Sequence, residues 1–318
     1  MAKKAPNNKA FSEKKILVIG DLIVDLYHYG NSGGRSHESG NSVGIHKRSA
    51  LTWGGAGLVV RNMLELGARV TFFSVLGDDE YSKKAAQFSH PNLRKKFLVQ
   101  KGREIITKER FVVDDLKVFR WNRGSTDSIS ATTRAALKQA IARELSKHKA
   151  VLIADYRAGL LSKELATYIT KMARAKKLPV YVDSQVVRTE PNFDWYRKTD
   201  LVCLNETEAK AAFAEFSCDA VRETLPLLAE SLAIQSVIVK LGAFGSAALI
   251  RGEYLETPAH SVDAIDPVGA GDAFLAALAM GQFPPTAEDL LFANRWAALA
   301  TTTMGTEPPK FSQLKKLI

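Results

Sequence analysis

Residues 266–274 (DPVGAGDAF) place two glycines and an acidic side chain directly before an apolar, helix-forming run. Glycines let the backbone turn so that several N–H groups face one spot, and a helix that begins there adds positive potential. Asp272, in the first turn of that helix, is expected to stay ionised near neutral pH and to accept a proton from an attacking hydroxyl. The motif therefore predicts a phosphoryl-transfer centre in which Asp272 is the base and Gly269, Ala270 and Gly271 hold the moving group.

The spacing of this motif alone fits a second interpretation equally well, a glycine-rich turn in which Asp272 only stabilises its helix. Other phosphate-binding motifs are missing from the sequence, which has no GxxxxGK[ST] loop, no HRD or DFG signature and no GxGxxG after a strand. These absences exclude a P-loop protein and a protein kinase, and they argue against a dinucleotide-dependent enzyme.

Polar side chains also follow four predicted strands at the point where each strand ends. They are Asp21 after KILVIG, Asp155 after VLIA, Asp183 after VYV and Asn205 after LVCL. A single residue of this kind commonly caps a turn or a helix. Ligands of open α/β sheets, however, bind just beyond the carboxyl ends of the strands, so four such residues together favour a binding site at that edge.

The helices and strands that must position these residues show two different sequence patterns. After a first strand at 15–20, the later chain alternates helices at 132–145, 163–175 and 206–213 with strands at 150–154, 179–182, 200–204 and 236–240. This alternation predicts a doubly wound, mainly parallel sheet covered by helices on both faces. Short alternating runs within 25–50 and 104–123 predict two hairpins that pair as a small β lid. We expect a solvated basic tail over residues 1–14 and one α/β domain over 15–318.

The composition limits the cellular compartment and the kinds of binding partner that we expect. The chain is 46% hydrophobic and contains only two cysteines, which form no disulfide framework and no zinc motif. It has neither a signal peptide nor the roughly 20-residue apolar run of a membrane helix, so we expect a cytoplasmic protein with no membrane contact. The net charge of +10 leaves nucleic-acid binding as an alternative. Because the basic residues are scattered and no nucleic-acid-binding signature accompanies them, we expect no such partner.

At the motif described first, the sequence resembles the ribokinase-like, or PfkB, carbohydrate kinases. DPVGAGDAF is similar to the family's D-T-x-G-A-G-D signature, with Pro267 where Thr is usual. The resemblance continues in the family's order from about Lys15 to Gly305. It includes Gly20-Asp21 with Asp25, the glycines at 54–57, the N-x-x-E motif of Asn205 and Glu208, the turn at 240–245 and the late helix at 292–298.

The resemblance implies an ATP-dependent sugar kinase. It places adenine between the turn at 242–245 and the helix at 294–298, and a Mg²⁺ ion on waters held by Asn205 and Glu208. The residues it assigns to the nucleotide are Asp183, Asn205, Lys240, Gly242, Gly245, Asp266 and Asn294. The lid is expected to cover the sugar, to exclude water and to pair with a second subunit in a homodimer.

Within the family, the segments 20–29, 35–38, 106–110, 119–120 and 154–156 resemble kinases that phosphorylate heptose 7-phosphate at C1, on the route to ADP-heptose. A phosphorylated sugar needs cations, and an arginine fork binds phosphate well. The resemblance implies a sugar pocket formed by Asp21, Asp25, Arg35, Gly54, Gly55, Asn62, Lys108, Arg110, Arg120 and Asp155. A solvated strand face is the other interpretation of its basic members Lys108, Arg110 and Arg120.

Three departures from the family pattern keep other functions open. Leu58 replaces an amide after the glycines, Gln185 replaces a cation, and Pro267 stands in the signature. They fit a kinase for another sugar or sugar phosphate, or a non-catalytic sugar-binding relative. The presence of Asp272 and of the N-x-x-E motif favours an active enzyme.

Overall fold

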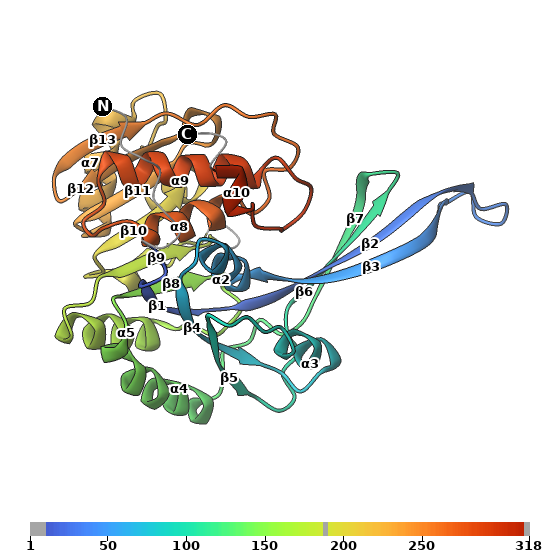
Figure 1. Ribbon diagram of the computed structural model, residues 1–318, viewed down its shortest axis with the longest axis horizontal. Helices are drawn as coiled ribbons and strands as arrows, with labels where there is room; N and C mark the ends of the chain where they lie inside the picture. Colours follow the sequence, from blue (N-terminus) through green and yellow to red (C-terminus); the bar gives the residue numbers. More distant parts are fainter. Residues whose placement is uncertain (1–10, 187–189, 315–318) are drawn as a thin grey trace.

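The structure is a computed structural model that describes residues 11–186 and 190–314 (Figure 1). Its body is a nine-stranded sheet in the order β13-β12-β11-β10-β9-β8-β1-β4-β5. The parallel strands are β1 (Lys15–Gly20), β4 (Arg69–Leu76), β5 (Leu93–Val99), β8 (Ala150–Asp155), β9 (Val180–Ser184), β10 (Leu201–Asn205) and β11 (Ser236–Lys240). Two antiparallel strands, β12 (Ser246–Ile250) and β13 (Glu253–Thr257), complete one edge.

Helices cover both faces of this sheet, as the alternation of elements predicts (Figure 1). One face packs against α2 (Ala56–Glu65), α3 (Glu80–Ala86), α8 (Ala270–Met280), α9 (Ala287–Ala300) and α10 (Phe311–Leu314). The other packs against α4 (Ala131–Glu144), α5 (Lys163–Ala175), α6 (Glu206–Ala212) and α7 (Val221–Leu232). Side chains of β1 alternate between the two cores, with Ile16 and Val18 on the first and Leu17 and Ile19 on the second. A central strand buried on both faces must be apolar throughout, which is why it reads as an unbroken apolar run.

The expected lid is a separate four-stranded sheet in the order β3-β2-β6-β7. It consists of β2 (Leu22–Arg35), β3 (Ser42–Gly55), β6 (Thr107–Val113) and β7 (Leu116–Arg123). β2 begins two residues after β1 ends, so the lid grows directly out of the carboxyl edge of the main sheet. The β2–β3 hairpin projects from the body as a long arm (Figure 1).

The folded body begins earlier than expected. Most of the tail predicted at 1–14 lies outside the described residues, but Phe11 is buried and its ring centroid lies 5.4 Å from that of Phe292. Lys14 Nζ also donates to the carbonyl of Gly281. The expectation of a solvated tail is therefore wrong for residues 11–14, because an aromatic side chain docks against α9. None of the helices in the described ranges combines the length and the apolarity that crossing a bilayer requires.

Candidate active site

The carboxyl ends of the central strands meet at one edge of the sheet, where the sequence analysis placed the site. The parallel register sets Ala154 opposite Asp183, and Asn205 opposite Lys240. Asp21 and Asp155 follow at the ends of β1 and β8. The polar residues at the strand ends thus form one continuous row.

The amino end of α8 supplies donors at this edge. Gly269 is the N-cap and has φ 87°, a left-handed conformation that favours glycine. A Cβ atom there would also lie 2.7 Å from Leu58 Cδ2, so a side chain would clash with the buried leucine. The first N–H groups of a helix have no partner within the helix and are available to an anion. The ammonium of Lys240 adds charge here, because a Cβ on Gly271 would lie 3.4 Å from Lys240 Nζ.

Asp272 stands in the first turn of α8, and the hydroxyl of Tyr156 donates to its Oδ1. Burial raises the pKa of Asp272 to about 7, and the charge of Asp183 adds to this rise. The Tyr156 hydrogen bond and the charges of Lys240 and Lys108 act in the opposite direction. Burial therefore acts against the ionisation that the sequence analysis expected for Asp272 near neutral pH, and it outweighs the favourable helix end. A base that titrates near neutral pH is well suited to proton transfer.

An ion pair links two strands on the α8 side of the site. Lys240 Nζ lies 2.5 Å from Asp183 Oδ2. Burial works against the charge of Lys240, but Asp183 and Glu208 together raise its pKa. This lysine therefore stays cationic next to the donors of α8.

Asn205 and Glu208 form a capping box at the start of α6. Asn205 N donates to Glu208 Oε2 at 2.8 Å, and Glu208 N donates to Asn205 Oδ1 at 2.9 Å. Burial and the nearby charge of Asp183 raise the pKa of Glu208 to about 7. Within the described ranges, no three His, Cys, Asp or Glu side chains cluster as a preformed metal cage. The excess of carboxylates here instead suits a cation that arrives with phosphates.

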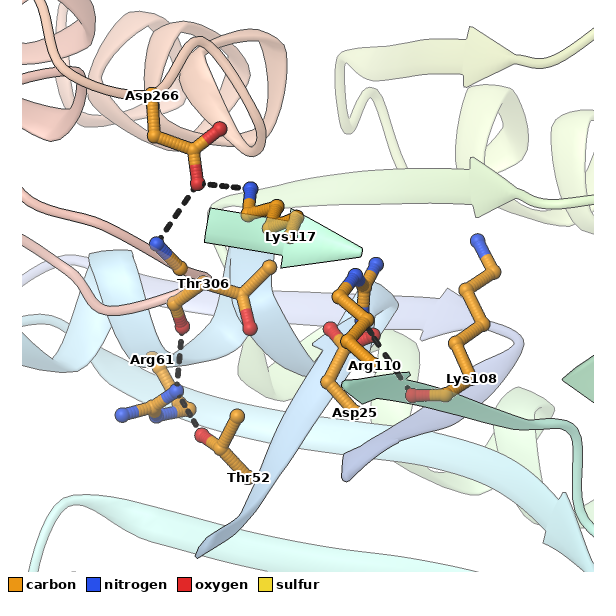
Figure 2. A network of polar contacts seen from close by, with 9 residues as sticks. Asp25, Thr52, Arg61, Lys108, Arg110, Lys117, Asp266 and Thr306 are labelled. Atoms are coloured by element: carbon orange, nitrogen blue, oxygen red, sulfur yellow. Dashed lines mark hydrogen bonds and ion pairs between the residues drawn. The ribbon is translucent and has the colours of Figure 1, made fainter. Parts of the chain in front are cut away.

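The base of the lid forms the other wall of the site. Arg110 and Asp25, both buried, form an ion pair between β6 and β2. A Cβ on Gly54 would overlap the carboxylate of Asp25, so only glycine fits there. Lys108 projects from β6 beside Arg110 (Figure 2). Burial lowers the pKa of Lys108, while the charges of Asp25 and Asp272 raise it. The Lys108 ammonium is therefore within electrostatic reach of both Asp25 and Asp272.

A second ion pair ties the lid to the signature loop. Lys117 of β7 contacts Asp266 Oδ2, as Figure 2 shows. The same carboxylate accepts from Gly305 N at 2.8 Å and, through Oδ1, from Val268 N at 3.2 Å. Burial opposes the charge of Asp266, but these hydrogen bonds and Lys117 hold its pKa below the usual range. Asp266 therefore orders the loop, and its assignment to the nucleotide site stays a prediction.

Two strand-end aspartates are bound within the protein. Asp21 is 4% exposed and accepts from the N–H groups of Tyr156, Ala158 and Leu160 at 3.1–3.2 Å. Asp155 is 2% exposed, and its Oδ2 accepts from Ser184 Oγ, Asn192 Nδ2 and Tyr196 OH at 3.1, 2.8 and 2.6 Å. In the structure the carboxylates of Asp21 and Asp155 hold the loops around them, and their assignment to the sugar stays a prediction.

Two asparagines expected at binding surfaces are also internal links. Asn62 donates to the carbonyl of Leu58 at 2.9 Å and accepts from Trp296 Nε1 at 2.9 Å, so it joins α2 to α9 in the core. Asn294 Nδ2 donates to Thr257 Oγ1 at 3.0 Å and to the carbonyl of Pro258 at 3.1 Å. These contacts use the amide of Asn62 and the amino group of Asn294 within the protein, and the binding roles expected for the two residues stay predictions.

Arg35 and Arg120 lie on different parts of the lid. Asp25 pairs with Thr52 at the base of the arm, whereas Arg35 pairs with Ser42 near its tip. Ten residues of strand separate Asp25 from Arg35, a span of roughly 30 Å. Arg35 is therefore outside this chain's own pocket, contrary to expectation. Arg120 lies opposite Arg110 on β7 and is close enough to lower the pKa of Lys108, although burial is the main cause of that shift.

The sequence analysis missed two residues at this edge. Tyr156 entered it only as part of a similar segment, yet its hydroxyl contacts Asp272. Phe244 lies in the short helix η3 (Gly242–Phe244) and is 82% exposed. Two residues further along the chain, Ser246 Oγ accepts a hydrogen bond from Asn294 Nδ2, so this turn lies next to Asn294. The only sequence signal for Phe244 was its place in the expected adenine turn.

Comparisons with known proteins agree with this geometry. The model of the pfkB family of carbohydrate kinases matches residues 13–312. The bifunctional protein HldE of Nitratiruptor sp. is 28% identical over 95% of this chain, and that of Rhodopseudomonas palustris is 29% identical over 97%. The chain spans 64% of the length of each of these relatives.

Solved structures show the same fold. Arabidopsis thaliana ribokinase complexed with ribose and ATP has a TM-score of 0.70 at 19% identity, over 96% of this chain and 98% of the ribokinase. Escherichia coli phosphofructokinase-2 in complex with fructose-6-phosphate has a TM-score of 0.75 at 14% identity, over 96% and 97% of the two chains.

Proposed function

The chain belongs to the pfkB family of carbohydrate kinases, and we propose that it phosphorylates a sugar that already carries a phosphate. Family membership makes it a sugar kinase and implies ATP as the phosphoryl donor. The observation that carries the proposal is the cationic wall at the base of the lid. Arg110 neutralises Asp25, but Lys108 and Arg120 add positive charge on the same face. A neutral sugar has no use for this excess, whereas a phosphate group requires it.

Heptose 7-phosphate, phosphorylated at C1 on the route to ADP-heptose, is the specific substrate that we propose. It is supported by the sequence segments that resemble heptose-phosphate kinases and by the HldE relatives that match 95% or more of this chain. Another sugar phosphate is the second candidate, favoured by the likeness to a phosphofructokinase solved with fructose-6-phosphate.

The transfer step follows from the positions of Asp272, Lys240 and α8. An Asp272 oxygen accepts the proton of the attacking hydroxyl while the new O–P bond forms and the bond to ADP breaks. N–H groups at Ala270 and Gly271 and the ammonium of Lys240 stabilise the charge on the moving phosphoryl group. The lid excludes water, which limits hydrolysis of ATP.

Mg²⁺ would neutralise the nucleotide phosphates. Asn205 and Glu208 would hold it through waters, with Asp183 beside them, because Mg²⁺ keeps several waters when it binds. The fit is supported by the raised pKa of Glu208, which burial causes and the charge of Asp183 increases. A bound cation would relieve this crowding of carboxylates.

Adenine would lie between η3 and α9. The exposed ring of Phe244 offers it a flat apolar surface, and Gly242 has φ 60° with open space around its Cα. Asn294 would support this pocket from below by holding the segment after β13.

The lid is also the surface that we propose for a homodimer. β7 is exposed along its whole length and carries the large apolar side chains of Val118, Phe119 and Trp121. An exposed apolar edge strand is a common site of pairing between chains. Sedimentation of the wild type and of Trp121→Glu tests the proposal: we expect a dimer that the variant weakens. A wild-type monomer at micromolar concentration would contradict it.

Coupled ADP release over a panel of sugars tests the substrate proposal. The panel holds heptose 7-phosphate, fructose 6-phosphate, ribose and mannose. We expect kcat/KM to be at least about tenfold higher for a phosphorylated sugar, since a charge-assisted contact contributes about 1.5–3 kcal/mol. A preference for a free sugar would contradict the proposal. No turnover with any sugar would favour a sugar-binding protein.

Lys108→Gln tests whether the positive charge of Lys108 binds the phosphate group of the sugar. We expect it to raise KM for the phosphorylated sugar and to change KM for a free sugar much less. Lys101→Gln, at an exposed lysine outside the lid sheet, is the matched control. An equal rise for both kinds of sugar would contradict a phosphate contact.

A further inference from the structure

Tyr156 lies at a point that connects the two walls of the site. It follows β8 directly, and its hydroxyl donates to Asp272 Oδ1. The ammonium of Lys108 lies 5.9 Å from the centre of its ring. Tyr156 is therefore in contact with the base and next to the cationic wall.

We propose that Tyr156 is a positioning residue for the base: its hydroxyl fixes one oxygen of Asp272, so that the other oxygen faces the accepting alcohol. The inference rests on the proposed function, because it takes Asp272 as the base. It assigns to Tyr156 an effect on the orientation and the ionisation of Asp272, with no proton given up by the tyrosine itself.

The backbone around Tyr156 is fixed by buried groups. Its N–H donates to Asp21 Oδ2 at 3.1 Å, and the same carboxylate binds the N–H groups of Ala158 and Leu160. On the other side of this loop, Arg103 donates to the carbonyl of Ala158 at 2.5 Å. A loop held in this way fixes the tyrosine ring, and a fixed donor orients its acceptor more strictly than a mobile one.

Asp21 gains a function from this arrangement. Its carboxylate holds the loop that carries the tyrosine that contacts the base. The strand-end aspartate of β1 would therefore act on catalysis through two hydrogen bonds in series.

Protonation states support a donor role for the hydroxyl. Burial, and then the charge of Asp272, raise the pKa of Tyr156 well above its usual value, so it keeps its proton throughout the working pH range. Its hydrogen bond lowers the pKa of Asp272, against the larger effect of burial. The other charged groups that act on Asp272 are Asp183, which raises its pKa, and Lys240 and Lys108, which lower it. Removal of the hydroxyl leaves those three in place and makes the ionised base less stable.

Tyr156→Phe in the full chain tests the inference in two ways. The first measurement is the pKa of Asp272 in the resting protein, from ¹³C NMR of labelled aspartate carboxyls with Asp272→Asn for assignment. We expect the pKa to rise by about one unit, since a hydrogen bond to the charged form of a carboxyl has an effect of that order. An unchanged Asp272 pKa would overturn the inference whether or not a substrate is known.

The second measurement is the pH dependence of kcat with a sugar that the wild type phosphorylates. We expect the acidic limb to move to higher pH, so that the loss is largest below pH 7 and shrinks toward pH 8.5, while KM for the sugar changes less. Tyr168→Phe, whose hydroxyl contacts only the carbonyl of Lys138 at 3.4 Å among the contacts described, is the matched control. A loss that is equal at every pH would contradict positioning and indicate a structural role.

Incorporation of 3-fluorotyrosine at position 156 keeps the test decisive if the Phe variant does not fold. The fluorinated phenol is a stronger donor of nearly the same shape, so the acidic limb should move to lower pH. A shift in the opposite direction, or none, would overturn the inference. A wild type that phosphorylates no sugar would refute the proposed function, while the NMR result would still decide the Tyr156–Asp272 coupling.

Discussion

The acidic residues at the carboxyl edge of the sheet form two groups that differ in what surrounds their oxygens. On the β1–β8 side, Asp21 and Asp155 are enclosed by protein donors and hold loops in place. On the β9–α8 side, Asp183 and Asp272 face cations and a tyrosine, next to the donors of a helix end. The same residue type at the same edge thus holds loops in one half and, in our proposal, takes part in phosphoryl transfer in the other.

The difference teaches that the supply of local donors separates the two roles. An oxygen that already accepts two or three hydrogen bonds from its own loop has little capacity left for a ligand. An oxygen next to a lysine and a helix amino end lies in a field that also attracts phosphate. Substitutions that act on stability in one group and on turnover in the other test this division.

Asp272→Asn should show the largest effect, a fall in kcat of at least about 10³-fold, because the amide cannot accept the proton. Nucleotide affinity should stay within a few-fold of the wild type. Asp263→Asn, at an exposed position before the signature, is the control and should leave kcat unchanged. Turnover within about tenfold of the wild type would show that Asp272 is not one of the residues that carry out the transfer.

Asp155→Ala should destabilise the fold by about 3 kcal/mol in urea unfolding, because Ser184, Asn192 and Tyr196 lose their common acceptor. The folded fraction should retain most of its activity. Asp194→Ala, which breaks the exposed 2.7 Å pair with Lys163, should cost less than about 1 kcal/mol. A loss of activity at unchanged stability would show that Asp155 acts in the transfer and not in holding the fold.

Asp272→Asn should also make the protein more stable, and increasingly so as pH rises. The folded pKa of Asp272 is about 7, above its ordinary value of 3.8, so the native state binds this proton more tightly than the unfolded chain. Wild-type stability therefore falls as pH rises through this window, whereas the amide variant escapes the fall. We expect the stability gap in thermal unfolding to grow by about 2–3 kcal/mol between pH 5 and 8. A gap that shrinks over this range would show that Asp272 is not destabilised by burial.

Lys117→Met should have the smallest effect, a loss of about threefold to tenfold in kcat/KM. The ion pair with Asp266 ties lid strand β7 to the signature loop, but the side chain of Lys117 is 31% exposed, so solvent weakens the pair. The variant should also be more sensitive than the wild type to proteolysis within the lid. Unchanged kinetics and unchanged proteolysis would show that the lid and the loop move independently.

The sequence predicted the parallel sheet correctly for a physical reason. Strands such as β1 are buried on both faces, so they must be apolar throughout, and the helices between them make the parallel order the expected one. The antiparallel strands β12 and β13 were not foreseen, since short runs such as SAALI do not reveal their pairing. The lid hairpins were expected, but the length of the β2–β3 arm, which carries Arg35 far from Asp25, was not.

Contacts that form only in the folded protein, together with burial, explain the remaining differences between the sequence analysis and the structure. Nothing in the sequence around Asp155 shows that Ser184, Asn192 and Tyr196 converge on it from residues far along the chain. The contact between Tyr156 and Asp272 of α8 likewise depends on tertiary packing, because the two residues are 116 positions apart in the sequence. The helix end favours an ionised Asp272, as the sequence suggested, but burial of the site outweighs it.

A structure with ADP, a planar phosphoryl mimic such as aluminium fluoride and the preferred sugar tests the central claim most directly. The account predicts that the accepting oxygen lies about 2.6–3.2 Å from an oxygen of Asp272, with the mimic against the amino end of α8. A sugar held elsewhere, with Asp272 turned away from the accepting oxygen, would contradict it.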